Sequence, residues 1–415
     1  MIKIWPKIIL FNLIVVLLSC KSELHQHEDI FIQLDKVCIH HHFSGSVLVA
    51  YEDSILFDQA YGYTDENKTQ QNNQNTIYPI ASVTKLFIKH AILQMVEEGL
   101  LSIDDSMSEH LKGMMYGDEI KISQLLYHQS GLPDIHNRIA RYDNPWLLHY
   151  PIKLDALLDS INSFEKLDFK PGSQSAYSNS NYLILARIIE NISHQSLDDY
   201  LQEKIFKPFQ LQSTGLYKEH SHVENHAKGY STQNGSIVFT PDFNFRNFWG
   251  SGNAFSSTHD LYQYYLNCNQ YLSANISQQL VQHSGLYTGY RSYYKVVPEI
   301  GLAIIILSNN GDFKLDLMVN LLSDYFNSTL WSENRDINSG EMSGTYQASR
   351  FQEEIVAKIA FRSHKYYFND MELVQIKENV FMIPNSGFTV LNFLPSTKKM
   401  ILNDNGILWS FTKIE

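Results

Sequence analysis

The chain has 415 residues, which is enough for two or three domains of ordinary size. Hydrophobic residues make up 44% of it and charged residues only 18%, so the composition excludes a disordered or collagen-like chain and disfavours a coiled coil. The formal net charge of -12 and the lack of a compact basic patch in the sequence argue against nucleic acid as a partner.

The N-terminal segment has the pattern of a secretion signal. Two lysines precede an apolar run from Ile8 to Leu18, which is too short to span a bilayer comfortably. The run leads to Cys20, in a context that resembles a bacterial lipobox. We therefore expect a lipoprotein signal peptide over 1–19, lipidation of Cys20 and a polar tether over 20–28. An ordinary signal peptide that happens to contain a cysteine is the alternative.

These features predict where the mature protein resides. We expect it to be exported and lipid-anchored to the cell envelope, in the periplasm or at the outer membrane, with the lipid as its membrane contact. Two further cysteines remain, Cys38 and Cys268, and nothing in their spacing indicates a disulfide, so we expect both to be free.

For the first part of the mature chain, the sequence pattern predicts both helices and strands. Helices are indicated by apolar residues at helical spacing, and strands by short apolar runs between turn signals. The uninterrupted run Leu302–Leu307 (LAIIIL) predicts a central strand that is buried on both faces. We expect helices over 29–41, Ser82–Glu98 and Leu315–Phe326, strands over Phe43–Ala50 and Ile55–Gly62, and further helices and loops up to about residue 280.

Residues 341–415 have a different pattern, that of a small, barrel-like all-β domain. Segments of strand length alternate there with turn signals. We place the larger domain at 29–327 and a polar linker at 328–340. The predicted strands are Ile355–Phe361, Tyr366–Phe368, Val380–Ile383, Phe388–Phe393 and Ile407–Phe411.

Ser82 and Lys85 begin the predicted long helix in the pattern Ser-x-x-Lys. Residues three apart lie on one side of a helix, so the two side chains are expected to meet. A serine hydroxyl needs a neighbouring base, and a lysine serves as that base only if its pKa falls well below about 10.4. The pattern is short, and a helix cap beside a solvated lysine is the plain alternative.

Two further patterns follow at larger separations. Tyr177 and Asn179 form Tyr-x-Asn after a Pro-Gly turn signal; a tyrosine can relay a proton, and an asparagine can bind both a lysine and a substrate amide. His283 and Gly285 form His-x-Gly upstream of the strand Leu302–Leu307. A glycine at a strand edge lets a substrate backbone approach closely. The order of the three patterns carries more weight than any one of them.

In this order the patterns resemble those of the serine β-lactamase-related family, which contains class C β-lactamases, D-alanyl-D-alanine carboxypeptidases, D-aminopeptidases and related esterases. Leu125–Pro133 is similar to the family's LLTHTSGLP stretch, and Gly252–Leu261 to its GGLxSTxxDL stretch. The resemblance covers about Asp29–Phe326 and implies an α/β fold of the β-lactamase/DD-peptidase type, with an antiparallel sheet flanked by helices plus an all-helical region. Residues 341–415 resemble the lipocalin-like β domain often appended to such proteins.

The resemblance also implies roles for the matched residues. Ser82 would be the acylated nucleophile, and Lys85 either the general base or the group that lowers the pKa of Tyr177. Tyr177 would pass a proton to the leaving group and then help to activate water. Asn179 would orient the substrate amide, and the N–H groups of Ser82 and Leu286 would form the oxyanion hole. The implied reaction is a two-step acyl transfer with no metal and no cofactor.

His283 departs from part of the family, because class C β-lactamases and many carboxypeptidases carry lysine there. A histidine is largely neutral at pH 7 unless its surroundings raise its pKa, so the substitution argues against true β-lactamase activity. We still expect His283 and Gly285 to contact the substrate. Leu286 and Tyr287 stand where small residues are more usual, and they would narrow the acyl pocket.

We therefore predict an exported, lipid-anchored serine hydrolase that acts on a small amide or ester, with a D-amino-acid-containing peptide favoured. The alternative enzyme is a carboxylesterase of the same fold. The alternatives from other classes are a penicillin-binding or sensing protein without turnover and a scaffold whose C-terminal β domain binds a partner. The expected partner is a small-molecule or peptide substrate, with no nucleic acid, and the sequence predicts no oligomeric state.

Overall fold

The computed structural model describes residues 27–138, 150–218, 223–234, 236–240, 244–332, 342–350, 353–383, 389–404 and 407–414. The predicted signal peptide and Cys20 lie outside these residues. Within the described ranges, no helix combines the length and the apolar character that crossing a membrane requires.

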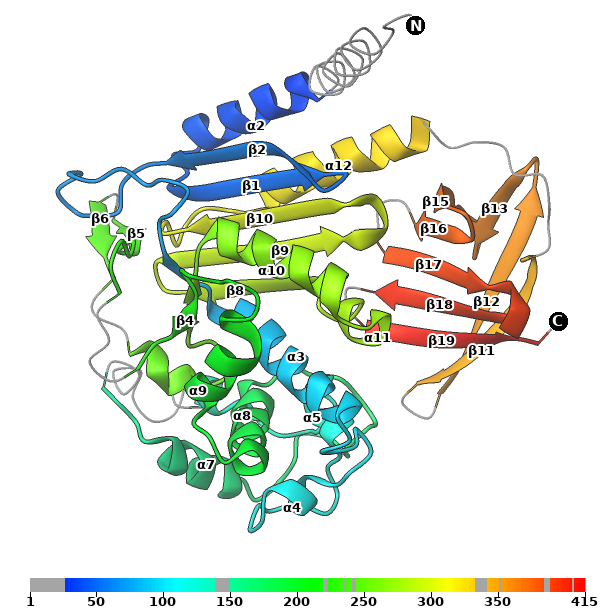
Figure 1. Ribbon diagram of the computed structural model, residues 1–415, viewed down its shortest axis with the longest axis horizontal. Coiled ribbons are helices and arrows are strands. Elements are labelled where there is room, and N and C mark those ends of the chain that lie inside the picture. The colour runs from blue at the N-terminus through cyan, green and yellow to red at the C-terminus, as the bar shows by residue number, and fades with distance from the viewer. Residues whose placement is uncertain are drawn as a thin grey trace, which may run out of the picture.

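A five-stranded antiparallel sheet forms the centre of the larger region (Figure 1). Strand β10 (Leu302–Ser308) lies in its middle, and all seven of its residues are buried, which confirms the predicted central strand. Pairing of β10 with β1 joins the two ends of this region, and β8 forms one edge. The other strands, in sheet order, are β2 (Ser54–Tyr61), β1 (Gly45–Tyr51), β9 (Tyr290–Val297) and β8 (Gln282–Tyr287).

The alternating side chains of this sheet enter two separate cores. Val49 and Ile304 contribute to the core shared with α2 and α12, whereas Leu48 and Ile305 contribute to the core shared with α3 and α10. Successive residues of a strand point to opposite faces, and helices cover both faces here, so the strands read as continuous apolar runs. The four helices are α2 (Glu28–His40), α12 (Asp316–Ser332), α3 (Thr84–Glu97) and α10 (Thr258–Tyr271).

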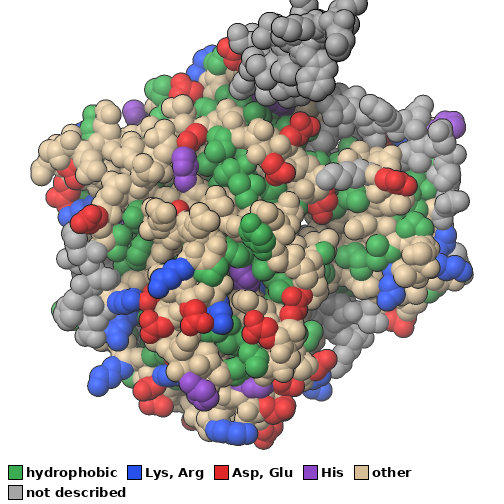
Figure 2. All heavy atoms as spheres, viewed as in Figure 1, with side chains coloured by type: hydrophobic (Ala, Val, Ile, Leu, Met, Phe, Trp, Pro, Cys, Tyr) green, Lys and Arg blue, Asp and Glu red, His purple; other side chains and the backbone are tan. Residues whose placement is uncertain are grey.

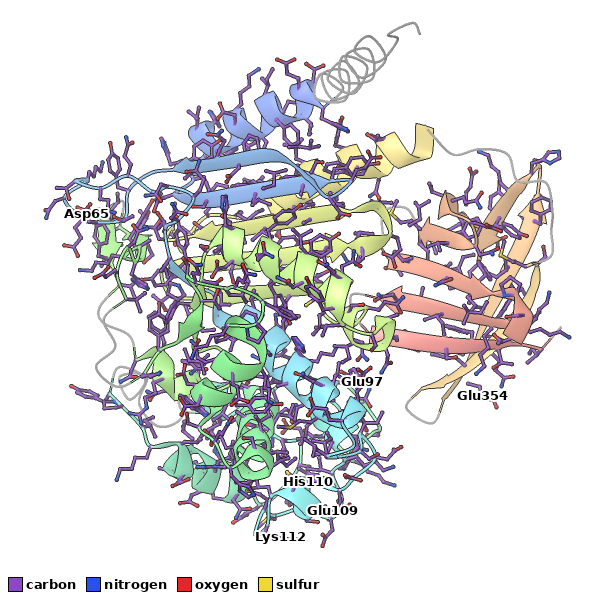
Figure 3. All side chains as sticks on the ribbon, in the orientation of Figure 1. Asp65, Glu97, Glu109, His110, Lys112 and Glu354 are labelled. Carbon is purple, nitrogen blue, oxygen red and sulfur yellow. The ribbon has the colours of Figure 1, made fainter. Side chains whose placement is uncertain are left out.

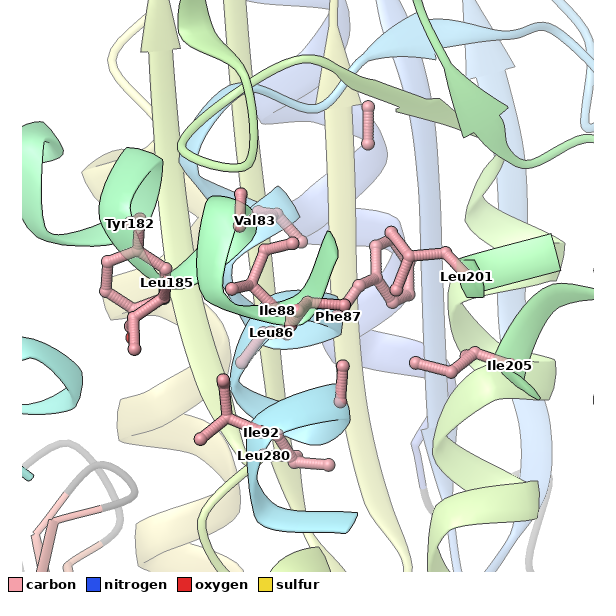
Figure 4. Close-up of a cluster of buried hydrophobic side chains, with 14 of the residues drawn as sticks. Val83, Leu86, Phe87, Ile88, Ile92, Tyr182, Leu185, Leu201, Ile205 and Leu280 are labelled. Atoms are coloured by element: carbon pink, nitrogen blue, oxygen red, sulfur yellow. The ribbon is translucent and has the colours of Figure 1, made fainter. Parts of the chain in front are cut away.

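Helices and short strands make up the rest of the larger region, most of them below the sheet in Figure 1 and the β5–β6 hairpin beside its left end. Helix α3 lies inside it, and its apolar side chains meet those of α8, α9 and the π-helical turn η4 in one cluster (Figure 4). The elements of this region are β3 (Tyr78–Pro79), α4 (Met107–His110), α5 (Ile122–Leu126), α6 (Ile135–Arg138), α7 (Leu154–Asn162), α8 (Asn179–Ser193), α9 (Leu197–Leu201), η4 (Gln202–Phe206), β4 (Gly215–Leu216), β5 (Tyr230–Gln233), β6 (Ser236–Phe239), η5 (Phe245–Phe248), β7 (Ala254–Ser256) and α11 (Ala274–Ser277).

The C-terminal residues form a nine-stranded, barrel-like antiparallel sheet. It packs against the larger region, because Val374, Met382 and Val390 belong to the same core as α2 and α12. The structure contains every strand that we predicted here, and it adds four that the pattern did not indicate, β11, β14, β15 and β18. The strands are β11 (Gly344–Arg350), β12 (Glu353–Arg362), β13 (Lys365–Phe368), β14 (Met371–Glu372), β15 (Val374–Lys377), β16 (Val380–Ile383), β17 (Thr389–Leu394), β18 (Lys399–Asp404) and β19 (Ile407–Lys413).

The predicted ends of the linker and of the tether differ from the observed helix and core. Helix α12 continues to Ser332, past residue 328 where we placed the start of the linker, and within this extension Ser328 and Thr329 donate their hydroxyl groups to the Tyr325 carbonyl. At the other end the polar tether stops short of residue 27, since His27 is buried and its Nδ1 lies 2.7 Å from the Tyr325 hydroxyl.

Charged side chains are spread over the surface. On the face shown in Figure 2, acidic and basic side chains are interspersed over the helical region. In Figure 3 the labelled Glu97, Glu109, His110 and Lys112 lie on the outside of that region, while Asp65 marks a loop and Glu354 the C-terminal sheet. Cys38 and Cys268 are free thiols buried in the two different cores.

Candidate active site

Ser82 lies in the short 3-10 turn η1 (Ala81–Val83) that precedes α3, rather than in the first turn of the predicted α-helix. Ala81 has a φ of 45°, a left-handed conformation that is unfavourable for a residue with a side chain. The turn is held by Thr84 Oγ1 and Ser292 Oγ, which donate to the carbonyls of Ala81 (2.6 Å) and Ile80 (2.7 Å). As a result Ser82 is partly exposed between two buried neighbours.

Lys85 reaches Ser82 from the first turn of α3. Its Nζ donates to Ser82 Oγ at 3.1 Å, to Asn179 Oδ1 at 2.8 Å and to the Ser251 carbonyl at 2.5 Å. The side chain is only 1% exposed, and burial lowers the pKa of Lys85 to about 7 although the Asp134 carboxylate opposes the shift. At neutral pH a substantial fraction of Lys85 is therefore the free amine, which can accept the proton of Ser82.

Tyr177 approaches Ser82 from the other side. Its hydroxyl lies 2.7 Å from Ser82 Oγ, and Lys85 Nζ stands 4.9 Å from the centre of its ring. Burial raises the pKa of Tyr177 well above its ordinary value, although the hydrogen bond with Ser82 acts in the opposite direction. The side chain is 49% exposed, so water screens part of this shift, but the phenol stays protonated at neutral pH in either case.

Asp134 is a member of this site that our sequence reading missed. Asn179 is the first residue of α8, and its backbone N–H (2.6 Å) and its Nδ2 (2.9 Å) both donate to Asp134 Oδ2. This clamp turns Asn179 Oδ1 towards Lys85. The available signal was position, because Asp134 directly follows the Leu125–Pro133 stretch that we had singled out.

The third motif lies on the edge strand β8, where that strand approaches η1. A Cβ atom on Gly285 would stand 2.5 Å from the Ile80 carbonyl oxygen and 2.9 Å from Ala81 Cβ, so only glycine permits this approach. Leu286 pairs with Arg291, one step outward from the pair that closes a two-residue turn. Residues at that step do not bond to the partner strand, so the Leu286 N–H points to the free edge.

His283, on the same strand, lines the cleft together with Ser82. Its Nδ1 donates to the Ser284 carbonyl at 2.8 Å. Burial, followed by the charge of Lys85, lowers the pKa of His283 to about 3. The side chain is half-buried, so water screens part of this shift, but the imidazole is predominantly neutral at pH 7 in either case. It therefore offers hydrogen bonding rather than a fixed positive charge.

The cleft that holds these groups has a volume of about 1520 Å³. Lys89 is a second lysine in its wall that we did not single out, although its place four residues after Lys85 in an apolar run was a signal. It is 8% exposed, and burial lowers the pKa of Lys89 to about 7.

Tyr287 also lines the cleft, with its hydroxyl bonded to the Gly252 carbonyl (2.7 Å), whereas Trp249 packs against the helical core. The side chain of Leu286 is 65% exposed at the rim.

The structure thus brings together Ser82, Lys85, Tyr177 and Asn179, and it places His283, Gly285 and Leu286 along the facing edge strand. The arrangement joins a hydroxyl, a lysine that is partly the free amine and a protonated phenol, all within hydrogen-bond reach at an accessible point. Such a set can transfer an acyl group through a covalent ester. The proposed lipidation site Cys20 is outside the described residues.

Known proteins with similar sequences and structures include proteins of Staphylococcus aureus. Protein flp of strain N315 is 28% identical over 345 residues, covering 72% of this chain and 67% of that protein. Teichoic acid D-alanine hydrolase of strain MRSA252 is 28% identical over 245 residues, covering 59% of each chain. The crystal structure of FmtA from the same species superposes with a TM-score of 0.62 at 23% identity, covering 71% of this chain and 88% of that chain, and it shows the shared fold.

The family described as Beta-lactamase matches residues 28–280, a span that includes the first two motifs and ends just before His283. That match covers more than half of the chain, and the fold and the relatives agree with it. The chain belongs to the Beta-lactamase family, and it is a serine hydrolase of the β-lactamase-related type.

Proposed function

We propose that the chain hydrolyses a small amide or ester through an acyl intermediate on Ser82, and that the acyl group contains a D-amino acid. The observation that carries this proposal is the position of Ser82 Oγ, 3.1 Å from Lys85 Nζ and 2.7 Å from the Tyr177 hydroxyl in an open cleft. A serine with a base on one side and a proton donor on the other is arranged for acyl transfer.

In the first step Ser82 Oγ attacks the substrate carbonyl carbon while its proton passes to the free amine of Lys85. The N–H groups of Ser82 and Leu286 stabilise the resulting oxyanion. The bond to the leaving group then breaks, Tyr177 gives its proton to the departing nitrogen or oxygen, and the proton held by Lys85 restores the phenol. Because the pKa of Tyr177 lies well above its ordinary value, we assign the role of base to Lys85.

In the second step water attacks the ester carbonyl and gives up a proton to the free amine of Lys85. The bond to Ser82 Oγ breaks, the acid is released and Oγ regains its proton. Asn179 holds the substrate amide with its side chain, and Asp134 keeps that side chain in place through the two hydrogen bonds to Asn179.

The proposal of a D-amino-acid substrate draws on a relative. Teichoic acid D-alanine hydrolase, by its name, removes D-alanine from an envelope polymer, and it shares 28% identity with this chain. A plain carboxylesterase is the second candidate. The neutral His283 favours it, because a site without a fixed charge at that position does not require a substrate carboxylate.

Covalent labelling of the full-length protein in detergent tests the proposal. We expect a fluorophosphonate probe to label the wild-type protein and to leave Ser82→Ala unlabelled. D-alanine methyl ester should be hydrolysed by the wild type, with kcat falling about a million-fold in Ser82→Ala. Faster hydrolysis of the L-alanine ester would favour the plain esterase. Penicillin labelling that persists without hydrolysis would favour a binding protein. Labelling of Ser82→Ala at the wild-type rate would exclude Ser82 as the nucleophile.

We also propose that the protein is exported and anchored to the cell envelope through a lipid on Cys20. The support is the sequence of residues 1–20 together with the envelope polymer in the name of one relative. Mass spectrometry of the purified protein should find diacylglycerol on the thiol of an N-terminal Cys20. A protein that starts at another residue and is released by salt washing would contradict the anchor.

A further inference from the structure

The nine-stranded sheet touches the loop that forms one wall of the cleft. Asn403, near the end of β18, donates from Nδ2 to the carbonyl of Gln278 at 2.9 Å. Gln278 caps the C-terminus of α11, and Gln279 and Gln282, which follow it, line the cleft. In Figure 1 helix α11 lies beside the ends of β18 and β19. The sheet therefore contacts Gln278, which directly precedes the cleft residue Gln279 in the chain.

From Gln279 the contacts continue into the helical region. Gln279 is 6% exposed, its Nε2 donates to the Asn275 carbonyl (2.8 Å) and its Oε1 accepts from the Tyr127 hydroxyl (2.5 Å). Both ends of the amide are thus fixed. Tyr127 itself lines the cleft, and Lys89 Nζ lies 5.1 Å from the centre of its ring.

His128, which follows Tyr127 in the chain, contacts Tyr177. The His128 ring lies 4.6 Å from the Tyr177 ring, centre to centre. His128 also accepts the backbone N–H of Ala176 on its carbonyl (3.0 Å) and that of Ser178 on its Nδ1 (3.2 Å). The residues on both sides of Tyr177 are held by His128, so a continuous series of contacts leads from Asn403 to Tyr177.

The nine-stranded sheet is also fastened in place near this contact. Val390, which pairs with Asn403 in the neighbouring strand β17, is buried in the core shared with α2 and α12. Buried apolar side chains resist sliding because a displaced side chain leaves a cavity or a clash. The Asn403 contact is therefore made from a rigid body rather than from a loose appendage.

We propose that the C-terminal sheet positions the wall of the active-site cleft through Asn403, and that Asn403, Gln279 and Tyr127 are positioning residues for substrates that extend past Gln282. This inference rests on the proposed hydrolysis at Ser82 and adds a determinant of substrate length. A substrate with a short leaving group ends before it reaches this wall. A longer leaving group packs against Gln279 and Gln282, so it depends on their placement.

The experiment compares two esters of D-alanine, the methyl ester and the phenylbutyl ester, which share the scissile bond and differ in the length of the leaving group. The full-length protein is assayed with Asn403→Leu, and with Gln347→Leu as a matched control, since Gln347 lies on the same sheet in β11 and removes an amide elsewhere. Loss of one hydrogen bond predicts about a fivefold rise in KM for the phenylbutyl ester. We expect kcat to change by less than about twofold, and KM for the methyl ester to rise less than KM for the phenylbutyl ester.

A second variant keeps the test decisive if Asn403→Leu does not fold. Tyr127→Phe removes only the hydroxyl that binds Gln279, and it should raise the KM of the phenylbutyl ester by a similar factor. The double variant Asn403→Leu/Tyr127→Phe should have the same KM for the phenylbutyl ester as either single variant. Effects of residues in one series of contacts are not additive. Equal KM values for Asn403→Leu, Gln347→Leu and wild type, or additive effects in the double variant, would overturn the inference. Failure of the wild type to hydrolyse either ester would instead count against the proposed function.

Discussion

The cleft and the nine-stranded sheet differ in what they bury. The cleft encloses Lys85 and Lys89, both with a pKa lowered by burial. The interior of the sheet is a cluster of apolar and aromatic side chains, and Thr389 is the one buried polar residue among the described residues of the sheet. Burial of a charged side chain costs stability, so the buried lysines of the cleft indicate a catalytic role for that region. The apolar interior of the sheet contributes mainly to stability through packing.

The largest effect is expected from Lys85→Met, which removes the base and keeps the shape. We expect kcat/KM to fall about 100-fold to 10,000-fold, the range that a general base contributes. The free energy of unfolding should change by less than about 2 kcal/mol, since the lost hydrogen bonds are offset by removal of a buried ammonium group. Ester hydrolysis and thermal unfolding measure the two quantities. A variant that keeps its activity would remove Lys85 from the mechanism.

Gly285→Ala tests whether β8 must lie against η1. The added Cβ would be 2.5 Å from the Ile80 carbonyl oxygen, so strand and turn must separate. Loss of an oxyanion donor typically reduces the rate about 100-fold to 1000-fold, and we expect a fall of that size in kcat. Steady-state hydrolysis of D-alanine methyl ester measures it. Activity within threefold of the wild type would mean that the edge strand tolerates the shift, contrary to the geometry.

Phe381→Ala is expected to lower stability rather than catalytic rate, because it affects packing away from the active site. Phe381 is fully buried between Tyr366 and Phe393, with ring centres 5.3 and 5.6 Å away. We expect the free energy of unfolding to fall by about 3–5 kcal/mol. Calorimetry should show one transition that shifts as a whole, since the sheet shares a core with α2 and α12. Two separate transitions would indicate that the sheet unfolds independently.

The smallest effect is a pH dependence, and it separates the two possible bases. The free amine of Lys85 accepts the proton, so the rate of Ser82 labelling should rise as pH increases through about 7 and fall below it. The slope is about tenfold per pH unit on the acid side. The labelling rate of a neutral fluorophosphonate, followed across pH, measures this. A midpoint above about 10 would identify Tyr177 as the base instead.

The nucleophile motifs could be predicted because each is a short local pattern. Ser82 and Lys85 are three residues apart, and the structure brings their atoms within 3.1 Å, as helical spacing predicts. Tyr177, 95 residues from Ser82, was singled out by its Tyr-x-Asn pattern, but its role beside Ser82 was implied by the resemblance to a family and not by spacing. Asp134 and Lys89 were missed, because the position of Asp134 after the Leu125–Pro133 stretch and of Lys89 four residues after Lys85 marks them only as neighbours of motif residues and does not show which side chains they will face.

The C-terminal strands show the same limit. Runs such as Val380–Ile383 are apolar enough to predict, and the structure has that strand with the same bounds. Strand β11 (GTYQASR) is largely polar, and its pairing with β12 and β19 makes it a strand. A strand is stabilised by the neighbours that it pairs with, so its own residues need not reveal it.

The sequence by itself therefore determined the family, the fold class, the central strand at Leu302–Leu307 and the residues of the three motifs. The tertiary structure decided which groups meet at the cleft. It placed Asp134 under Asn179, put Lys89 in the cleft wall and brought Asn403 against Gln278. Periodicity and motifs are properties of neighbouring residues, whereas burial, pKa shifts and contacts across more than a hundred residues arise only when separate segments pack together.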